Sequence, residues 1–248
     1  MQARKPLIAG NWKMNKTRAQ AKAFVAEFLA DWQDIPDREV ALMVPFTLLE
    51  TVQINIGSAA IGLGAQNIFW EKSGAFTGEI SAEMLKDAGC QYTLIGHSER
   101  RTIFQETDQD VYLKIQSALA SGIIPICCVG ENLQQREAGE AKMVVERQLT
   151  AALQNVDLTL PLVVAYEPVW AIGTGKVASA DDAQDMAQFI REVLTRFNPT
   201  GADIRILYGG SVSEQSIDTL MQQPDIDRAL VGGASLQSDV FLKIARFK

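Results

Sequence analysis

The sequence predicts an α/β fold, a single closed (β/α)8 barrel with a parallel eight-stranded core, and three observations support this prediction. Eight short apolar runs alternate with longer amphipathic segments. The 248 residues allow about 31 residues per strand–helix unit, and closed barrels of this kind are typically about 250 residues long. No linker rich in Ser, Gly or Pro interrupts the pattern, so residues 1–248 are expected to form one domain.

Each apolar run is too short for a helix and is predicted to be a strand. Most runs are continuously apolar, which is typical of strands buried on both faces of a parallel sheet. In chain order the predicted strands are Leu7–Ala9, Val40–Val44, Ile61–Ala65, Tyr92–Ile95, Ile123–Val129, Leu162–Tyr166, Ile204–Tyr208 and Ala229–Val231.

The segments between these runs carry helical spacing. Apolar stripes with a period near 3.6 residues run through Phe24–Trp32 and Met186–Phe197. Ser179 and Ser211 each stand three residues before an acidic residue, so each is predicted to cap a helix. An open, doubly wound sheet is the alternative fold. No Gly-x-Gly-x-x-Gly motif follows the first predicted strand, which favours the closed barrel.

Composition and charge exclude several classes of protein. The chain has 23 Lys and Arg against 30 Asp and Glu, a net charge of −7 and no basic run, so neither nucleic acid nor an anionic membrane is expected as a partner. No apolar run approaches the roughly 20 residues of a membrane span, and the N-terminal stretch lacks the apolar region of a signal peptide. The protein is therefore expected to be soluble and cytoplasmic.

The cysteines and the histidine limit redox and metal chemistry. Cys90, Cys127 and Cys128 are too few for a disulfide framework and fit reduced thiols in a cytosolic enzyme. Cys128 is predicted to pack as a small hydrophobe in the core behind the site. No zinc or haem spacing is present, and the chain has one histidine, so no metal site is expected.

Polar residues and glycines directly after the predicted strands are the candidate site residues, because barrels of this class build their sites at the C-terminal ends of the strands. They are Asn11 and Lys13 after the first strand, His97 and Glu99 after the fourth, Glu167 after the sixth, Gly209, Gly210 and Ser211 after the seventh, and Gly232 and Gly233 after the eighth.

The two glycine pairs indicate a phosphate site. Barrel enzymes often bind phosphate with the loops after strands seven and eight and a helix N-terminus, where backbone N–H groups can approach the oxygens. Either pair alone would indicate only a tight turn, but both together favour phosphate. Since the net charge repels a dianion, Lys13 is the candidate for local attraction, although a lone loop lysine is ordinarily solvated.

Glu167 and His97 are the candidate acid–base residues. Glu167 ends a buried run, and partial burial is expected to raise its pKa toward the range of a general base, unless the side chain turns to solvent. His97 is either a hydrogen-bonded structural residue or a catalyst. Ser98 is expected to cap a helix there, and the positive end of that helix would lower the pKa of His97 and keep its ring neutral.

Two loops are longer or less regular than a simple connection. Segment 66–81 exceeds the usual strand-to-helix loop of about 2–6 residues and could be a polar surface excursion. Segment 168–176 mixes apolar residues with two glycines, as a hinged lid or a rigid surface loop would. The candidate lid consists of Pro168, Val169, Trp170, Ala171, Ile172, Gly173, Thr174, Gly175 and Lys176.

Five stretches resemble the triosephosphate isomerase family and occur in the family's order from end to end. They are Ala9–Asn15, Tyr92–Arg101, Ala165–Gly175, Tyr208–Val212 and Val231–Leu236. The resemblance implies a TIM barrel that interconverts dihydroxyacetone phosphate and D-glyceraldehyde 3-phosphate through an enediolate, in glycolysis and gluconeogenesis. It implies no cofactor and no metal.

The resemblance also implies a role for each site residue. Glu167 would move a proton between neighbouring carbons, and His97 would polarise the carbonyl group and shuttle protons between the oxygens. Lys13 would supply positive charge, Asn11 would position groups around the oxyanion, and Glu99 would lie behind Lys13.

The same resemblance assigns the phosphate grip and the assembly. Ser211, Gly232 and Gly233 would hold the phosphate together with Gly173 N–H, which a closing lid would bring to it while excluding water. Segment 66–81 would dock into a second subunit near Met14, with Thr77 reaching toward the partner's site. A homodimer is therefore expected.

Two alternatives to this function are weighed. Another sugar-phosphate isomerase or epimerase would often need a metal or an aromatic pocket, and neither is evident in the sequence. A non-catalytic barrel scaffold would be expected to have lost at least one of Lys13, His97 and Glu167, and this chain retains all three.

Overall fold

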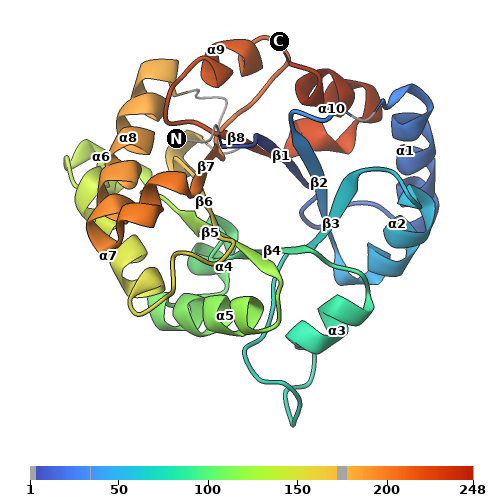
Figure 1. The fold of residues 1–248 in the computed structure, drawn as a ribbon, viewed down its shortest axis with the longest axis horizontal. Helices are drawn as coiled ribbons and strands as arrows, with labels where there is room; N and C mark the ends of the chain where they lie inside the picture. Colours follow the sequence, from blue (N-terminus) through green and yellow to red (C-terminus); the bar gives the residue numbers. More distant parts are fainter. Residues whose placement is uncertain (1–3, 34, 172–177, 248) are drawn as a thin grey trace.

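The computed structural model of the chain describes residues 4–33, 35–171 and 178–247. Eight parallel strands close into a barrel in chain order, with β8 paired to β1, and the helices surround it (Figure 1). The strands are β1 (Leu7–Asn11), β2 (Glu39–Val44), β3 (Ile61–Ala65), β4 (Tyr92–Ile95), β5 (Ile124–Val129), β6 (Val163–Tyr166), β7 (Arg205–Tyr208) and β8 (Arg228–Val231). The predicted (β/α)8 fold is confirmed, as is every predicted strand, to within two residues at each end.

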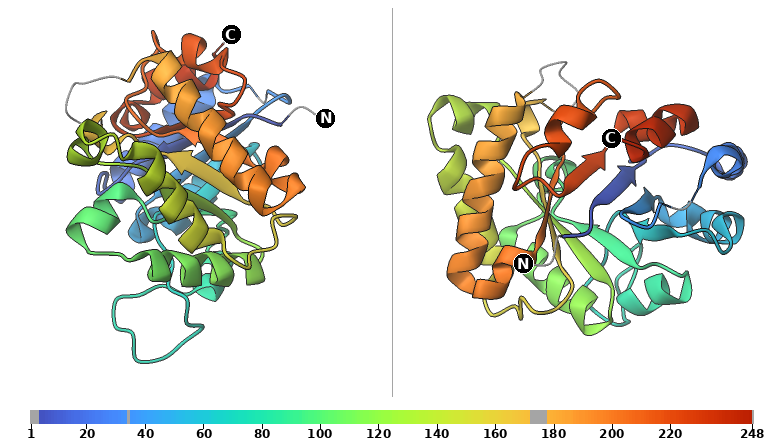
Figure 2. Two further views of the ribbon diagram at one scale, coloured as in Figure 1. Left: turned by 90° about the vertical axis from the view of Figure 1, so that its left-hand side faces the viewer. Right: turned by 45° about the horizontal axis from the view of Figure 1, so that its top comes forward.

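Helices follow the strands and cover the outside of the barrel, which Figure 2 shows from two further sides. The α-helices are α1 (Arg18–Asp31), α2 (Leu49–Ile56), α3 (Ala82–Asp87), α4 (Ser98–Ile103), α5 (Asp108–Ala120), α6 (Leu133–Glu137), α7 (Ala141–Leu153), α8 (Ala180–Phe197), α9 (Ile217–Met221) and α10 (Ser238–Ala245). Short 3-10 helices are η1 (Phe46–Leu48), η2 (Val169–Ala171), η3 (Pro199–Asp203) and η4 (Gly233–Leu236). No helix in the described ranges is long and apolar enough to cross a membrane.

The strands are apolar on both faces because each face packs against a different part of the core. In β1, Leu7 and Ala9 belong to the cluster inside the barrel, and Ile8 belongs to the cluster between barrel and helices. Phe24 and Phe28 of α1 are buried in that outer cluster, as their spacing predicts. Two opposed clusters therefore explain the continuous apolar runs.

One of the three predicted helix caps, that at Ser179, is correct, and the cap predicted at Ser98 is described with the site. Ser179 is the N-cap of α8 and forms a capping box with Asp182. The prediction for Ser211 is wrong, since α9 begins only at Ile217. The hydroxyl of Ser211 instead donates to the carbonyl oxygen of Ala171 at 2.9 Å, which joins the loop after β7 to the segment after β6.

Segment 66–81 extends away from the barrel between β3 and α3 (Figures 1 and 2). Its ends meet where Phe69 N–H donates to the carbonyl oxygen of Ile80 at 2.9 Å. The ring of Phe69 packs against Trp70 at 4.1 Å and against Phe76 at 4.8 Å between centroids. These contacts give the excursion an apolar centre of its own.

Candidate active site

A cavity of about 430 Å³ lies at the C-terminal ends of the strands and brings most of the predicted site residues together. It is lined by Asn11, Lys13, His97, Glu167, Gly209, Gly210, Ser211, Val212, Leu230, Gly232, Gly233 and Ala234. Glu99 lines an adjoining cavity of about 190 Å³, which shares Asn11, Lys13 and His97 with the first. Residues that lie far apart in the sequence thus meet because the barrel brings their strand ends together.

The end of β1 holds Lys13 in an unusual backbone conformation. Its φ of 51° lies in the left-handed region, which is costly for a residue with a side chain. Asn11 Oδ1 accepts the Lys13 N–H at 2.9 Å, and the Gln66 amide donates to the Lys13 carbonyl oxygen at 2.9 Å. Because these bonds hold the turn, the lysine side chain crosses the cavity beside Gly232, where an added Cβ would lie 3.5 Å from Lys13 Cε.

The charge of Lys13 is paired inside the site. Lys13 Nζ lies 2.5 Å from Oε1 of Glu99, which stands in the first turn of α4. Glu99 therefore fixes the ammonium group from the side of the adjoining cavity. This placement agrees with the expectation that Glu99 lies behind Lys13.

His97 and Glu167 are both buried and contact each other directly. His97 Nε2 lies 2.9 Å from Oε1 of Glu167, and Ser98 N–H donates to Oε2 at 2.9 Å. His97, not Ser98, is the N-cap of α4, because its Nδ1 accepts the Glu99 N–H at 3.2 Å. That bond leaves the hydrogen of a neutral imidazole on Nε2, pointing at the carboxylate.

The contact between these two residues reverses both pKa predictions. Burial raises the pKa of Glu167, but His97, the Ser98 N–H and Lys13 lower it more, so the pKa lies below its ordinary value. Burial lowers the pKa of His97, but the Glu167 carboxylate outweighs burial and raises it. The predictions of a raised glutamate pKa and a depressed histidine pKa are therefore wrong for this arrangement, since neither considered the other residue as a neighbour.

The surroundings of the two glycine pairs differ. A Cβ at Gly209 would lie 2.9 Å from Cγ of Glu167, and one at Gly210 would lie 2.2 Å from the hydroxyl oxygen of Tyr208. That pair is glycine because other side chains pack directly against it. A Cβ at Gly233 would meet nothing within 4 Å, so Gly233 borders open space in the cavity, and Gly232 lies beside the Lys13 side chain.

The start of the predicted lid is anchored to a buried carboxylate that sequence reasoning missed. Trp170 Nε1 donates to Glu131 at 2.8 Å, the Tyr166 hydroxyl lies 3.1 Å from both Glu131 oxygens, and Arg136 lies 3.5 Å away. The bond from Trp170 to Glu131 therefore holds the first part of the predicted lid, residues 168–171. Ile172, Gly173, Thr174, Gly175 and Lys176 lie outside the described residues.

Three further features complete the description of the predicted site. Cys128 is fully buried in the cluster inside the barrel, where burial, and then Glu167, raise the pKa of its thiol. Glu131 and Gln66 follow β5 and β3 directly, so the strand-end rule could have found both. Among the residues placed by the structure, no group of three or more His, Cys, Asp or Glu side chains could hold a metal ion.

A closed barrel with an imidazole, a carboxylate and a lysine in its C-terminal cavity defines the class of (β/α)8-barrel enzymes. Within that class the chain belongs to the triosephosphate isomerase family, whose sequence profile, described as "Triosephosphate isomerase", matches residues 6–248.

Three relatives carry the name triosephosphate isomerase. The protein of Alkaliphilus metalliredigens is 50% identical over 248 residues, which cover 98% of this chain and 100% of the relative. The protein of Finegoldia magna is 50% identical over 98% of this chain and 99% of its own length. The protein of Chloroflexus aurantiacus is 51% identical over the same shares of the two chains.

Proposed function

We propose that the protein is a triosephosphate isomerase that interconverts dihydroxyacetone phosphate and D-glyceraldehyde 3-phosphate. The observation that carries the proposal is the single cavity of about 430 Å³ in which Glu167, His97 and Lys13 face the glycine loop after β8. The same cavity contains acid–base groups and the glycines Gly232 and Gly233. Family membership supports the same reaction.

Glu167 is the general base. Its carboxylate must first leave Ser98 and His97. It then takes a proton from one substrate carbon, which yields an enediolate, and delivers that proton to the neighbouring carbon. Once those contacts break, burial dominates and raises the pKa of Glu167. The contacts with Ser98 and His97 thus keep the Glu167 carboxylate ionised, and breaking them raises its pKa and makes it a stronger base.

His97 and Lys13 act on the substrate oxygens. With Glu167 withdrawn, Nε2–H of a neutral His97 can donate to the carbonyl oxygen and exchange a proton between the two oxygens of the enediolate. Removal of the carboxylate also removes the cause that raises the pKa of His97, which favours the neutral ring. Lys13 stabilises the developing oxyanion, and Asn11 orients the groups around it.

The phosphate binds beside the loops after β7 and β8. Ser211, Gly232 and Gly233 line this part of the cavity, and Gly173 of the lid contributes an N–H on closure. Binding energy gained on a group that does not react positions the reacting carbons and holds the lid shut against water. Glu131 and Trp170 form the anchor from which the lid moves.

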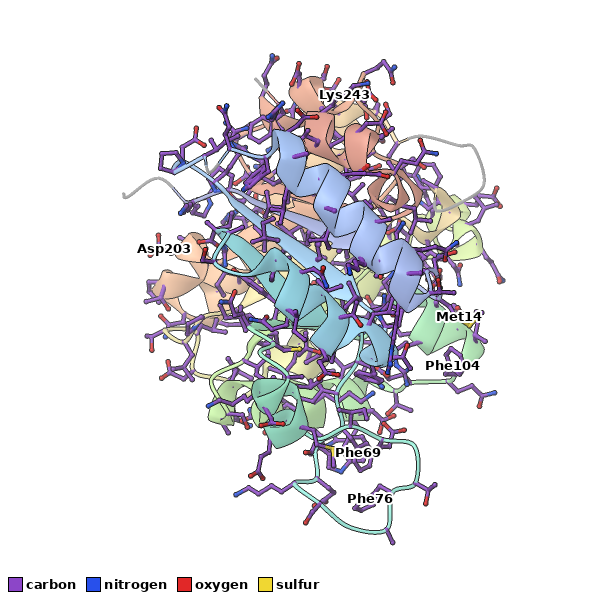
Figure 3. The ribbon with its side chains drawn as sticks, turned by 90° about the vertical axis from the view of Figure 1, so that its right-hand side faces the viewer. Met14, Phe69, Phe76, Phe104, Asp203 and Lys243 are labelled. Atoms are coloured by element: carbon purple, nitrogen blue, oxygen red, sulfur yellow. The ribbon has the colours of Figure 1, made fainter. Side chains whose placement is uncertain are left out.

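The active protein is a cytoplasmic homodimer of single barrel domains, residues 1–248. Met14 is 96% exposed and, with Phe104, lines the cavity of about 190 Å³ that leads to Lys13 (Figure 3). Figure 3 also shows Phe69 and Phe76 on the protruding excursion of segment 66–81. Thr77 at the tip of that excursion enters the corresponding cavity of the partner, so each subunit completes the other's site.

Turnover of D-glyceraldehyde 3-phosphate by the purified protein in the presence of a chelator tests this function. Fast formation of dihydroxyacetone phosphate by the parent, with a loss of about a thousandfold or more in Glu167→Gln, is the expected result. Rapid turnover by Glu167→Gln would contradict the role of the base. A folded, dimeric parent without turnover would mean that the barrel is a scaffold.

The assembly is tested separately by sedimentation and activity across a dilution series. Activity is expected to fall as dimers dissociate, because each site then lacks the partner's Thr77. Folded monomers with full activity would contradict the dimeric site.

A further inference from the structure

Lys16 stands three residues after Lys13, in the loop between β1 and α1, and has a φ of 74°. Like Lys13, it occupies the left-handed region that favours glycine and is costly for a residue with a side chain. Asn15 Nδ2 donates to the Trp12 carbonyl oxygen at 2.6 Å and holds the turn between them. The backbone at Lys16 is therefore held from within its own loop.

The Lys16 side chain is fixed at its ammonium group. Nζ donates to the carbonyl oxygen of Leu236 at 2.8 Å, and it lies 4.7 Å from the ring centroid of Phe24 and 5.2 Å from that of Trp12. Burial lowers the pKa of Lys16, with Glu27 acting in the opposite direction. The ammonium therefore rests on aromatic rings and a backbone carbonyl in place of part of its water shell.

The carbonyl that Lys16 binds belongs to the last residue of η4, where helix carbonyl oxygens lack partners within the helix. The other end of this segment is also tied, because the Ser235 hydroxyl donates to the Gly232 carbonyl oxygen at 2.7 Å. Ser235 is fully buried against β1, where a Cβ on Gly10 would lie 3.0 Å from its Cβ. Residues 232–236 thus form one unit that Lys16 connects to the loop carrying Lys13.

We propose that Lys16 is a positioning residue that holds residues 232–236 so that Gly232 and Gly233 face the substrate phosphate. This inference rests on the proposed function, which places the phosphate beside these glycines. Lys16 does not line the cavity and is connected to these glycines through its bond to the Leu236 carbonyl oxygen. It therefore determines the affinity for phosphate and leaves the acid–base groups unchanged.

Three variants separate this role from a general effect on folding. Lys16→Met keeps the apolar stem and the backbone strain but removes the ammonium, and Lys16→Arg restores a donor. Lys142→Met is the matched control, since Lys142 also lies near an aromatic ring, Phe189 at 5.4 Å, and binds a polar partner, Asp185 at 3.0 Å. That lysine is on α7 and lines none of the three cavities that include His97 or Glu167.

Kinetics with D-glyceraldehyde 3-phosphate and with phosphate-free D-glyceraldehyde provide the decisive comparison. In Lys16→Met the KM for the phosphate substrate is expected to rise about fivefold to tenfold with kcat within about twofold, because one charged hydrogen bond is lost. Turnover of D-glyceraldehyde should not change, Lys16→Arg should recover most of the affinity, and Lys142→Met should match the parent. An equal loss on both substrates, or no loss at all, would overturn the proposal.

Calorimetric titration with inorganic phosphate tests Lys16 even if the parent shows no turnover. The Kd of Lys16→Met is expected to exceed that of the parent by about the same factor as KM. Failure of the proposed function appears as an inactive parent, whereas failure of the Lys16 role appears as an unchanged phosphate affinity. The two results are therefore distinguishable.

Discussion

The two ends of the barrel both pair carboxylates with donors from the fold, but they use them differently. At the N-terminal end, Glu39 accepts from the Tyr92 hydroxyl at 2.8 Å and from Arg205 at 2.6 Å. At the C-terminal end, Glu167 accepts from Ser98 N–H and contacts His97. The partners of Glu39 belong only to the fold, whereas His97, the partner of Glu167, also lines the cavity.

Asp227 shows how complete the pairing is at the N-terminal end. It accepts from Arg4 at 2.6 Å, from Arg191 at 2.7 Å and from the Ile206 N–H at 2.9 Å. These three hydrogen bonds hold the Asp227 carboxylate in one position. The charges at the N-terminal end stabilise the barrel, whereas the proposed function requires the pairs at the C-terminal end to be exchanged for substrate contacts.

The largest effect is expected from removing the cation at the C-terminal end. Lys13→Met should lower kcat/KM for D-glyceraldehyde 3-phosphate about a thousandfold, because the oxyanion loses its positive partner in a site that excludes water. Steady-state kinetics and a melting curve measure both properties. A variant that melts far below the parent would show that Lys13 stabilises the fold. That result would contradict the separation of stability and chemistry between the two ends.

A large loss of stability, but not of activity, is expected at the opposite end. Asp227→Asn leaves Arg4 and Arg191 without their carboxylate and should lower the free energy of unfolding by about 3 kcal/mol. The kcat of the folded variant should stay within about twofold of the parent. Urea unfolding and kinetics on the same preparation measure this, and a parallel loss of kcat would contradict the separation.

The His97–Glu167 pair should stabilise the protein in a defined pH window. The lowered pKa of Glu167 adds stability that is present above its ordinary value of 4.5 and is lost as the pH falls through the lowered pKa. The raised pKa of His97 adds stability that is complete below 6.5 and is lost as the pH rises through the raised pKa. The stability advantage of the parent over His97→Gln should therefore be greatest between these values and shrink above pH 6.5. A constant difference in urea unfolding from pH 4.5 to 9 would contradict it.

The smallest effect is expected from Arg228, a residue with a strained backbone at the N-terminal end of the barrel. Arg228 has a φ of 129°, and its buried Nε has no hydrogen-bond partner among the described residues. Its guanidinium shares the ring of Phe247 with that of Arg38, and burial and then Arg38 lower the pKa of Arg228. Arg228→Gly should raise the free energy of unfolding by about 1 kcal/mol, because relief of strain exceeds the loss of the ring contact. A lower melting temperature would show that the ring contact dominates.

The alternation of apolar runs and amphipathic segments predicts the fold. Strand-end positions predict most of the cavity lining, because a parallel barrel places those positions together whatever the helices contain. Pairwise contacts could not be predicted in this way. The reversed pKa directions of Glu167 and His97 depend on a 2.9 Å contact across 70 residues of chain, and Ser211 bonds Ala171 in place of capping a helix. The strained backbones of Lys13 and Lys16 were also not predicted. The Asn11 and Asn15 side chains hold these turns locally, whereas the bond from Gln66 to Lys13 depends on the fold.

One pair of matched substitutions tests most directly whether the two ends divide chemistry from stability. Glu167→Gln and Glu39→Gln make the same change in a carboxylate at opposite ends, and kcat/KM and the free energy of unfolding are measured for both. Glu167→Gln should lose about a thousandfold in kcat/KM, and Glu39→Gln should keep kcat/KM within about twofold while losing about 2 kcal/mol of stability. A comparable loss of kcat/KM in Glu39→Gln, or full activity in Glu167→Gln, would contradict the division.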